Sequence, residues 1–487
     1  MDRPESHALA DTAQTPLGQA LAPALSDHPG QSGFYPLAQG KEAFAARIAL
    51  VRAATLSLDV QYYIFHPDDT GVALLAELLA AADRGVRVRL LLDDIHLGGQ
   101  DAVLAAIDSH AKIEVRIFNP FAHRKARLLD FATNYSRVNR RMHNKSMTAD
   151  NQLAVVGGRN VGDEYFAAHS DVDFSDLDLL AAGPVVPQVS AEFDAYWASS
   201  VVYPISSLAP PSDPQVLDRI RGRAAAYVET FRDSSYGRSL LETGLAQQIA
   251  HGKLESYWGA ATVIADKPDK VRLPPDDSST HAITQLSALL DQAQTELLLV
   301  SPYFVPRKQG VEWLASLARR GVKVRVLTNS YAATDVGAVH AGYAPYRKAL
   351  LAAGVELYEL KPGATALPDA GGKSIAGSSH ASLHAKTYMV DRRMLFVGSL
   401  NLDPRSVRLN TEMGIAMESA DLCARFGSGF DAKILEVAYR VTLENGKLAW
   451  TTVENGQEKK YDSEPGMNAL QGIGQFLLRI LPVEEQL

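Results

Sequence analysis

The chain contains the same polar motif twice, so it must build the same local structure in two places. Each copy places a lysine two residues after a histidine, followed at fixed offsets by an aspartate, a glycine and an asparagine. The copies are His143, Lys145, Asp150, Gly157 and Asn160, then His384, Lys386, Asp391, Gly398 and Asn401. Residues two apart on a β-strand point to the same face. We therefore expect each histidine–lysine pair to face one small volume.

The duplication extends well beyond the motifs. Predicted strands over 56–63, 84–93 and 113–118 correspond to predicted strands over 297–303, 320–329 and 355–360, and a predicted helix separates the first two strands of each half, at 71–83 and 310–320. Strand–helix–strand order favours an α/β sandwich in each half. A repeat of this length indicates one duplicated body rather than two unrelated domains.

Composition divides the chain into five segments. We expect a flexible N-terminal segment over 1–33, a first repeat over 34–205, a linker with a helical insertion over 206–284 and a second repeat over 285–437. In the last segment, 438–487, a hairpin is predicted around Asn445-Gly446, followed by an amphipathic helix over 467–481. The insertion is predicted to be helical over 217–252, between two proline-rich linkers.

Charge and cysteine content limit the possible functions. The formal net charge is −8, which argues against a general nucleic-acid binder, because such proteins usually carry a basic excess. The single cysteine, Cys423, excludes an intramolecular disulfide. The N-terminus lacks the pattern of a secretory signal, and no uninterrupted apolar stretch reaches the roughly 20 residues that cross a bilayer. Any membrane contact is therefore expected to be peripheral.

The two motifs together suit phosphodiester chemistry. Two imidazoles around one site can divide the work, since one attacks phosphorus and the other protonates the leaving oxygen, while the lysines stabilise negative charge. We expect no metal and no cofactor, because the chain has no His/Cys cluster at zinc spacing and no acidic calcium loop. Although they belong to the catalytic motifs, Asp150 and Asp391 are expected to hold the local backbone.

The motifs and their surroundings resemble the phospholipase D superfamily, most closely the bacterial cardiolipin synthases of the C type. The resemblance covers the chain from about residue 32 onward and is strongest over 59–65, 139–146, 157–166, 335–343, 382–386, 401–406 and 481–484. It implies two α/β/α sandwich repeats, packed as a pseudo-twofold pair around one shared active site. It also implies phosphatidyl transfer through a phosphohistidine without a metal.

A histidine nucleophile needs an acceptor on its far ring nitrogen, which sets the tautomer. By the resemblance, Glu412 fits the orienting carboxylate of the second copy. The matching strand of the first copy offers Asp176 and Asp178, and either or both could serve. We prefer Asp176, because its offset to Gly183 equals that of Glu412 to Ser419.

The remaining polar motif residues are candidates for binding the phosphate. Asn160 and Asn401 would donate amide N–H groups to phosphoryl oxygens. Ser399 is a further candidate in the second copy, but the first copy has a glycine in its place. This asymmetry is consistent with different roles for the two histidines. With the resemblance, it leads us to predict His143 as the nucleophile and His384 as general acid and then base.

The resemblance implies a cardiolipin synthase that uses phosphatidylethanolamine as donor and phosphatidylglycerol as acceptor. It also implies a position on the cytoplasmic face of the bacterial inner membrane, with a small accessory protein conceivable and no nucleic-acid partner. The alternatives are a phospholipase D that transfers the phosphatidyl group to water, a nuclease and an inactive scaffold. The acidic net charge counts against the nuclease, and the two intact motifs count against the scaffold.

Two further features have more than one interpretation. A basic, partly apolar stretch over 123–141 is predicted either to face anionic lipid or to be a solvated helix face, and the terminal helix over 467–481 is the other candidate for docking. Tyr63 and Tyr303 occupy matching strand ends as core residues or pocket wall, and we expect core.

Overall fold

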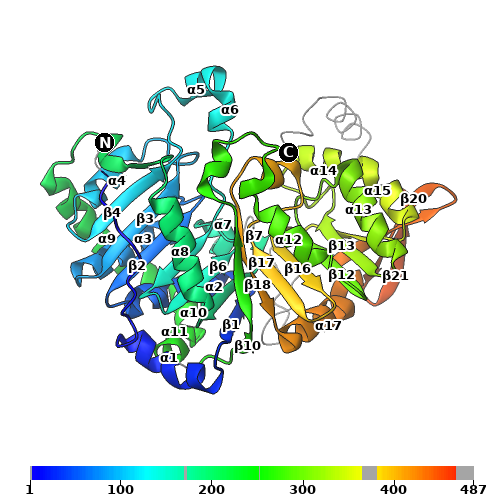
Figure 1. Ribbon diagram of the computed structural model, residues 1–487, viewed down its shortest axis with the longest axis horizontal. Coiled ribbons are helices and arrows are strands. Elements are labelled where there is room, and N and C mark those ends of the chain that lie inside the picture. Colours follow the sequence, from blue (N-terminus) through cyan, green and yellow to red (C-terminus); the bar gives the residue numbers. More distant parts are fainter. Residues whose placement is uncertain (1–2, 169–172, 252, 365–380, 468–487) are drawn as a thin grey trace.

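The computed structural model describes residues 3–168, 173–251, 253–364 and 381–467, and it contains two mixed sheets side by side (Figure 1). In each half three central strands run parallel, and antiparallel strands extend the sheet on both sides. The first sheet has the order β10 (Tyr257–Gly259), β1 (Ser32–Leu37), β8 (Asp178–Ala182), β6 (Leu153–Gly157), β5 (Ser146–Ala149), β2 (Ser57–Tyr62), β3 (Arg87–Asp93), β4 (Ile113–Phe118) and β9 (Val202–Pro204).

The second sheet repeats this arrangement and adds a hairpin at its edge. Its order is β11 (Ala261–Ala265), β18 (Met413–Glu418), β17 (Met394–Gly398), β16 (Lys386–Val390), β12 (Glu296–Val300), β13 (Lys323–Asn329), β14 (Glu356–Leu360), β19 (Ala438–Glu444), β20 (Lys447–Glu454) and β21 (Gln457–Tyr461). The predicted duplicated α/β fold is therefore confirmed, with β8, β6, β5, β2, β3 and β4 equivalent to β18, β17, β16, β12, β13 and β14.

Helices cover both faces of each sheet. The outer layer of the first half includes α2 (Gly40–Ala53), α3 (Asp69–Asp83) and α4 (Asp101–Asp108), and that of the second includes α12 (Ala282–Leu290), α13 (Arg307–Arg319) and α15 (Arg347–Ala352). On the inner faces lie α8 (Val185–Trp197) and α17 (Ala420–Val437). Shorter elements are α5 (Arg127–Thr133), α6 (Tyr135–Val138), α7 (Asp163–Phe166), α14 (Gly337–Tyr343), α16 (Pro404–Arg408), η1 (Ile205–Ser207), η2 (Pro268–Val271), η3 (Ser278–Thr280) and η4 (Ala344–Tyr346).

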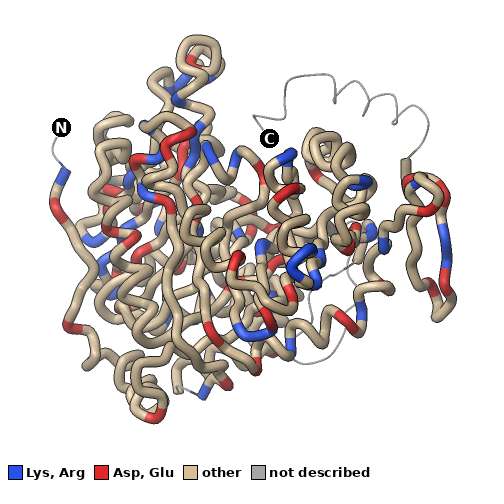
Figure 2. Tube along the Cα trace, turned by 45° about the vertical axis from the view of Figure 1, so that its right-hand side comes forward, with Lys and Arg blue, Asp and Glu red and all other residues tan. Residues whose placement is uncertain are grey.

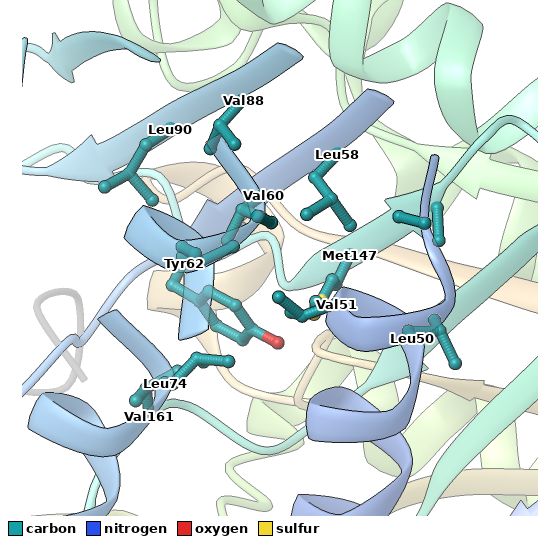
Figure 3. Close-up of a cluster of buried hydrophobic side chains, with 14 of the residues drawn as sticks. Leu50, Val51, Leu58, Val60, Tyr62, Leu74, Val88, Leu90, Met147 and Val161 are labelled. Carbon is teal, nitrogen blue, oxygen red and sulfur yellow. The ribbon is translucent and has the colours of Figure 1, made fainter. Parts of the chain in front are cut away.

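The outer core of the first half follows from strand and helix periodicity. Alternate residues of β2, namely Leu58, Val60 and Tyr62, point to one face, where they meet Leu50 and Val51 of α2 (Figure 3). These side chains are essentially fully buried. Burial of apolar surface at about 25 cal/mol per Å² makes this layer a main source of stability.

The two halves share a third core between their inner faces. It joins Val156 and Leu179 of the first sheet to Leu298, Val397 and Ile415 of the second, together with residues of α8 and α17. Two parallel pairings also cross between the halves. The strand β7 (Asp173–Ser175) pairs with β15 (Ala381–Leu383), and Met142 bridges to Thr411. These crossings bring both motifs to the same seam.

The N-terminal segment differs from the prediction. Residues 1–33 were predicted to be flexible, but α1 (Pro16–Asp27) packs Leu17 and Leu21 into the first core, and the Arg3 guanidinium donates to Ser199 O. The Thr15 side chain accepts from Gly18 N and caps the helix. The prediction was wrong because two leucines four residues apart share a helix face, even within a polar segment.

The other segments refine the predicted boundaries. The helix predicted over 217–252 is divided into α9 (Pro214–Asp233), α10 (Ser235–Glu242) and α11 (Leu245–Ala250), and these pack on α2 and α3. The segment predicted as a linker also supplies β10 to one sheet and β11 to the other. The predicted hairpin at Asn445-Gly446 is followed by a second turn at Asn455-Gly456, where both residues have positive φ. The terminal helix predicted over 467–481 lies outside the described residues, apart from Met467.

Basic and acidic residues are interspersed along the trace (Figure 2). Among the helices of the described ranges, none combines the length and apolar character that a membrane span requires.

Candidate active site

Both motif histidines lie at the seam between the halves, held there by backbone hydrogen bonds to the opposite half. His143 N donates to Thr411 O at 2.8 Å, and His384 N donates to Ser175 O at 2.8 Å. Each acceptor directly precedes a buried carboxylate in the sequence, Glu412 in one case and Asp176 in the other. The backbone pairing therefore sets each histidine beside the carboxylate of the other half.

The side chains repeat this crossed arrangement. His143 Nδ1 lies 2.8 Å from Glu412 Oε2, and His384 Nδ1 lies 2.6 Å from Asp176 Oδ2. Because an ionised carboxylate only accepts hydrogen bonds, each Nδ1 carries a proton, and each Nε2 holds a lone pair in the neutral ring and a second proton in the protonated ring. Neither half holds a complete histidine–carboxylate pair by itself. The sequence placed one carboxylate in each copy, but the crossing was not visible there.

The choice left open between two aspartates has a geometric answer. Asp178 accepts from Arg47 Nη2 at 2.9 Å and from Arg159 N at 3.2 Å, so its carboxylate is part of a buried ion pair. Asp176 is the one that contacts His384. The arrangement assigns Asp178 to the fold of the first half and Asp176 to the site.

Each motif lysine contacts the backbone carbonyl of the histidine two residues before it. Lys145 Nζ donates to His143 O at 2.6 Å, and Lys386 Nζ donates to His384 O. Both lysines are 1% exposed. Burial lowers the pKa of both ammonium groups, and Glu412 and Asp176 oppose this effect. The site therefore concentrates two ammonium groups in a volume shielded from water, where they interact strongly with an anion.

The two histidine–carboxylate pairs differ in their electrostatics. Burial, followed by the charges of Lys145 and Lys386, lowers the pKa of His143 well below its usual value. Burial also lowers the pKa of His384, but the neighbouring Asp176 opposes the shift. Burial raises the pKa of Glu412 to about 7. For Asp176, burial acts in the same sense, but the His384 imidazole, Lys386 and Arg159 together outweigh it and hold the pKa below its usual range.

Ser399 supports a carboxylate, in contrast to its predicted role at the phosphate. Its Oγ donates to Glu412 Oε2 at 2.5 Å and accepts from Met413 N at 3.1 Å. At the equivalent Gly158, an added Cβ would lie 2.3 Å from Asp176 Oδ1. The glycine therefore leaves room for the Asp176 carboxylate. The difference between Ser399 and Gly158 thus lies in how each half holds its carboxylate, Glu412 or Asp176.

The two motif asparagines are buried. They follow β6 and β17, the strands that pair with β5 and β16. Asn160 Oδ1 accepts from Ile64 N at 3.2 Å, and its side chain also hydrogen-bonds Tyr165. Asn401 is 2% exposed, and its Oδ1 has no partner within the described part of the chain. Their equivalent positions in the two halves are compatible with the predicted pair of amide donors.

Neither motif aspartate contacts a motif histidine. Both carboxylates instead accept hydrogen bonds from backbone N–H groups. Asp150 accepts from the N–H groups of Thr55, Leu56 and Ser57, and Asp391 accepts from those of Gln294, Thr295 and Glu296. A threonine hydroxyl adds a fourth contact in each case. Both carboxylates therefore anchor the chain entering β2 and β12. In the described ranges, no group of three or more His, Cys, Asp or Glu side chains is placed to hold a metal ion.

Of the two matching tyrosines, Tyr63 lines the site, and neither is the fully buried core residue that was expected. The Tyr63 ring is 4.8 Å from the His143 ring, and Lys145 Nζ lies 5.3 Å from its centroid. The Tyr303 hydroxyl donates to Asp335 Oδ2 at 2.7 Å. Both tyrosines are only partly buried.

Aromatic residues near His384 were not recognised from the sequence. The Tyr165 and Phe174 rings lie 5.4 and 5.2 Å from the His384 ring. Both come from the first half, so only the crossed packing of the halves brings them to the second histidine. The single available signal was the presence of Tyr165 within a motif-bearing run.

The basic stretch over 123–141 forms the base and tip of the protrusion that carries α5 and α6 (Figure 1). Arg124 and Arg127 both pair with the fully buried Asp94, and Arg124 also pairs with Asp101. These two arginines therefore fasten the protrusion to the first half. The tip is apolar, with Leu128 83%, Leu129 53% and Tyr135 48% exposed.

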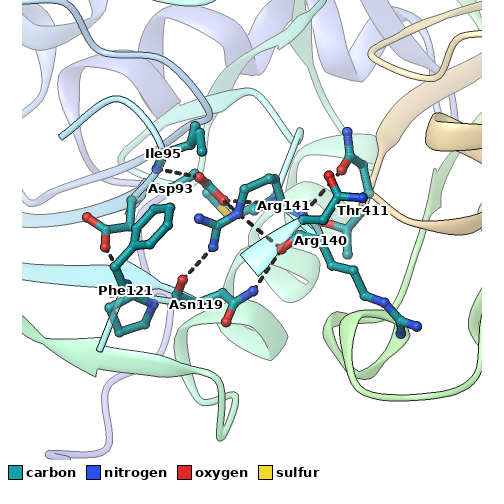
Figure 4. A network of polar contacts seen from close by, with 12 residues as sticks. Asp93, Ile95, Asn119, Phe121, Arg140, Arg141 and Thr411 are labelled. Atoms are coloured by element: carbon teal, nitrogen blue, oxygen red, sulfur yellow. Dashed lines mark hydrogen bonds and ion pairs between the residues drawn. The ribbon is translucent and has the colours of Figure 1, made fainter. Parts of the chain in front are cut away.

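A second polar network ties the same segment to the histidine. Arg141 is fully buried, lies 3.4 Å from Asp93 Oδ2 and donates to Asn119 O, while its own carbonyl accepts from Thr411 N at 2.9 Å (Figure 4). Met142 N also donates to Asp93 at 2.8 Å. The residues before His143 are thus held on both sides, which fixes the position of the imidazole.

Comparison with known proteins agrees with this geometry. The family model described as "Cardiolipin synthase, PLD-like domain" matches residues 48–197 and 286–434. The chain is 41% identical over 471 residues to cardiolipin synthase C of Escherichia coli (strain K12), covering 96% of this chain and 99% of that protein. It is 28% identical over 380 residues to cardiolipin synthase A of Pseudomonas putida, covering 77% of this chain and 63% of that one.

Among solved structures, the phosphatidylserine synthase of Haemophilus influenzae Rd KW20 has the same fold. It matches with a TM-score of 0.59 at 14% identity and covers 96% of this chain and 100% of that chain. The chain therefore belongs to the cardiolipin synthase family with phospholipase D-like domains. It is a phosphatidyltransferase of the phospholipase D superfamily, and its substrates are phospholipids.

Proposed function

We propose that the protein transfers a phosphatidyl group to phosphatidylglycerol, forming cardiolipin through a phosphohistidine on His143. The observation that carries this proposal is the crossed pairing of the two histidines with buried carboxylates. It leaves two Nε2 atoms available at one site, where the two motif lysines are also buried. The likeness to cardiolipin synthase C supports the same product.

The two histidines take different parts in the first step. His143, whose pKa lies well below its usual value, is neutral near pH 7, and its Nε2 attacks phosphorus. The bond between phosphorus and the headgroup oxygen breaks, and that oxygen takes a proton from His384. Asp176 is suited to this role, because its ionised carboxylate stabilises the protonated form of His384.

The second step reverses the proton transfer. His384 accepts the proton of a phosphatidylglycerol hydroxyl, and the oxygen attacks phosphorus. The bond between phosphorus and Nε2 of His143 breaks, which restores the free imidazole. Throughout, Lys145 and Lys386 stabilise the negative charge on the phosphoryl oxygens, and the amides of Asn160 and Asn401 are the proposed further donors.

Hydrolysis is the second candidate, because it shares the phosphohistidine and differs only in the acceptor. The test is to incubate purified protein with phosphatidylglycerol vesicles, with and without phosphatidylethanolamine, and to identify the products by mass spectrometry. Cardiolipin that contains acyl chains of the phosphatidylethanolamine supports the proposal, with phosphatidylethanolamine as donor. Phosphatidic acid as the sole product would instead identify a phospholipase D.

We further propose that the protein acts on the cytoplasmic face of the bacterial inner membrane and docks through the tip of α5 and α6. The tip presents Leu128, Leu129 and Tyr135 to solvent, next to the segment that leads into His143. Interfacial side chains of this kind enter the headgroup layer of a bilayer. The arginines at the base are engaged by carboxylates, so apolar contact is the main expected contribution.

The double substitution Leu128→Ser and Leu129→Ser should weaken docking. Burial of a leucine is worth about 1.5–3 kcal/mol, so binding to phosphatidylglycerol vesicles should fall at least about tenfold. Co-sedimentation measures this effect. The matched control is Leu241→Ser, because Leu241 is 64% exposed on α10, in a separate part of the first half. Equal binding by the double variant and the control would rule out docking by this tip.

A further inference from the structure

A buried cation supports the segment of each histidine-orienting carboxylate, but the two cations come from different parts of the chain. In the first half the cation is Arg159, which is fully buried. Its Nη2 donates to Asp176 O at 2.6 Å, and its Nε donates to Tyr165 O at 3.1 Å. Arg159 lies inside the first motif, between Gly158 and Asn160. In this half the motif itself therefore supplies the cation.

The second motif carries Leu400 at this position instead of an arginine, and the leucine is buried in the outer core of its half. The carbonyl that corresponds to Tyr165 O, by distance along the chain from the motif histidine, is Ser406 O. It accepts from Lys270 Nζ at 3.0 Å, and Lys270 is 1% exposed. Lys270 is therefore the counterpart of Arg159, although it comes from η2, in the segment between the two family-model matches.

Lys270 is linked to Glu412 by Asp266. The Lys270 ammonium donates to Asp266 Oδ2 at 2.9 Å, and both side chains are fully buried. The same oxygen accepts from Glu412 N at 2.7 Å, and Asp266 N donates to Glu412 O at 2.9 Å. Asp266 Oδ1 accepts from Ala282 N at 2.6 Å. Asp266 thus holds Glu412 by both its backbone N–H and its carbonyl, and Lys270 holds Asp266.

The same backbone segment contacts the histidine. Thr411, which precedes Glu412, accepts from His143 N at its carbonyl at 2.8 Å. Its hydroxyl donates to Asn144 Oδ1 at 2.9 Å. Glu412 Oε2 lies 2.8 Å from His143 Nδ1. Because Asp266 fixes the backbone of Glu412, it also fixes the place where this carboxylate meets the imidazole.

The first half leaves a positive charge next to its carboxylate. Arg159 and Arg47 both face the single carboxylate of Asp178, at 3.5 and 2.9 Å. Burial acts to raise the pKa of Asp176, but the motif cations and Arg159 outweigh it and hold the pKa below its usual range. The excess of cations therefore keeps Asp176 ionised.

The second half has balanced charges instead. Burial raises the pKa of Glu412 to about 7, and the charges of Lys145 and Lys270 oppose this shift. Asp266 acts against Lys270, because two carboxylates close together disfavour each other's ionisation. The titratable groups that act on Glu412 are His143, Lys145, Lys386, Lys270, Asp266, Asp403, Tyr63 and Tyr388. Of these, Lys270 and Asp266 come from outside the duplicated domains.

We propose that Lys270 and Asp266 are positioning residues of the reaction, which together hold the backbone of Glu412 against His143 and balance the charge behind its carboxylate. This inference rests on the proposed function, in which Glu412 orients a nucleophilic His143. The segment between the domains thus completes the site in the half whose motif lacks an arginine.

The test makes opposite changes of charge in the full-length protein. Lys270→Met removes a cation that favours ionised Glu412, so the decrease of activity at low pH should begin at higher pH. Asp266→Asn removes an anion that disfavours ionised Glu412, so the decrease should move to lower pH. Each midpoint should shift by about 0.5–1 unit, less than the roughly 1–3 units of a charge in direct contact. Headgroup release from phosphatidylethanolamine in micelles with phosphatidylglycerol is measured from pH 5 to 9.

A second readout does not depend on turnover. Diethyl pyrocarbonate acylates the unprotonated Nε2 of an imidazole, and peptide mapping follows this reaction at His143 as a function of pH. The rate should rise as Glu412 becomes ionised, because the charged carboxylate strengthens the hydrogen bond from Nδ1 and makes the ring more nucleophilic. Its midpoint should shift in the same directions in the two variants.

Matched controls come from the same segment. Lys267→Met and Asp269→Asn remove the same charges, but Lys267 is 52% and Asp269 60% exposed, in ion pairs with Glu192 and Arg272. Exposed pairs contribute little, so both midpoints should equal that of the wild type.

A double variant separates positioning from loss of the fold. Each single variant leaves one buried charge without its partner, so its thermal stability should fall. Lys270→Met combined with Asp266→Asn removes both charges and should regain stability, with a midpoint between those of the single variants. Its kcat above the midpoint should still be about 3–10-fold below wild type at unchanged KM, because Glu412 has lost its ionic support.

Opposite shifts in both readouts support the proposal. Shifts in one direction, midpoints equal to that of the wild type, or a double variant with wild-type kcat would overturn it. Disappearance of the low-pH decrease in Asp266→Asn would assign the titration to Asp266 and also contradict it. The expected shifts in acylation of His143, in a protein that releases no headgroup, would overturn the proposed function and leave the positioning role supported.

Discussion

The two halves of the molecule have the same strand order and the same motif, yet they support their histidines differently. His143 depends on a glutamate that is itself held by Ser399, whereas His384 depends on an aspartate packed against a glycine. Burial raises the pKa of Glu412 to about 7, while the pKa of Asp176 lies below its usual range. Equivalent positions have thus acquired different proton affinities.

This difference shows how a duplicated site performs two tasks. The backbone pairing places the two imidazoles equivalently, since the backbone N–H of each histidine donates to the residue before the opposite carboxylate. The carboxylates then determine how readily each imidazole holds a proton. Asp176 favours the protonated ring that an acid requires, and the weaker acid Glu412 leaves the other ring neutral for attack.

The largest expected effect comes from removal of either imidazole. His143→Ala should abolish formation of the phosphohistidine, and His384→Ala should lower turnover about 10²–10⁴-fold, because protonation of the leaving group is lost. Acid quenching followed by peptide mapping distinguishes the two roles. The label should lie on the peptide with His143 and should still form slowly in His384→Ala. A label on the peptide with His384 would reverse the assignment.

A smaller effect is expected from the carboxylates, because the imidazole remains. Glu412→Gln and Asp176→Asn should each lower kcat roughly 10–10²-fold, which corresponds to one lost charge-assisted hydrogen bond. The pH profile distinguishes the two variants. As pH falls through about 7, Glu412 becomes protonated and loses the negative charge that strengthens its hydrogen bond with His143 Nδ1, so wild-type activity should decrease.

In Glu412→Gln this decrease should disappear, because the amide does not titrate and is uncharged at every pH. In Asp176→Asn the decrease near pH 7 should remain, because Glu412 is intact. Initial rates measured from pH 5 to 9 with detergent-dispersed substrate provide the comparison. If the decrease survived in Glu412→Gln, it would belong to a group other than this carboxylate.

Much of the duplicated fold could be predicted from local patterns. β4 was predicted with its observed bounds, because alternating apolar residues mark a strand. The N-terminal helix was missed because its two buried leucines lie in a polar, proline-containing segment. The break between α9 and α10 was also missed, although Ser234 caps the second helix.

The motif indicated the reacting groups but not their partners. Offsets along the chain are local, whereas the pairing of Glu412 with His143 spans 269 residues and depends on how the halves pack. For the same reason the aromatic neighbours of His384 could not be found from the sequence. Ser399 was predicted to bind the phosphate, because the sequence could not show that its hydroxyl donates to the buried Glu412 carboxylate.

The smallest expected effect concerns the two motif aspartates, which hold the same turn in the two halves. Asp150 is fully buried, whereas Asp391 is partly exposed. Each carboxylate receives three backbone N–H groups and one threonine hydroxyl. Both residues have a φ of 50°, a conformation that asparagine adopts readily, so substitution by asparagine introduces no backbone strain.

Asp150→Asn should therefore lower the free energy of unfolding by about 3 kcal/mol. The NH2 group of the asparagine would face backbone N–H donors, and water cannot reach these donors to replace the lost hydrogen bonds. Asp391→Asn should cost only about 1–2 kcal/mol, since solvent replaces part of the lost hydrogen bonding. Urea unfolding followed by circular dichroism measures both. At a temperature where each variant is folded, activity should remain close to wild type, because neither carboxylate contacts a histidine. Loss of activity in a variant of normal stability would mean that the aspartate takes part in the chemistry.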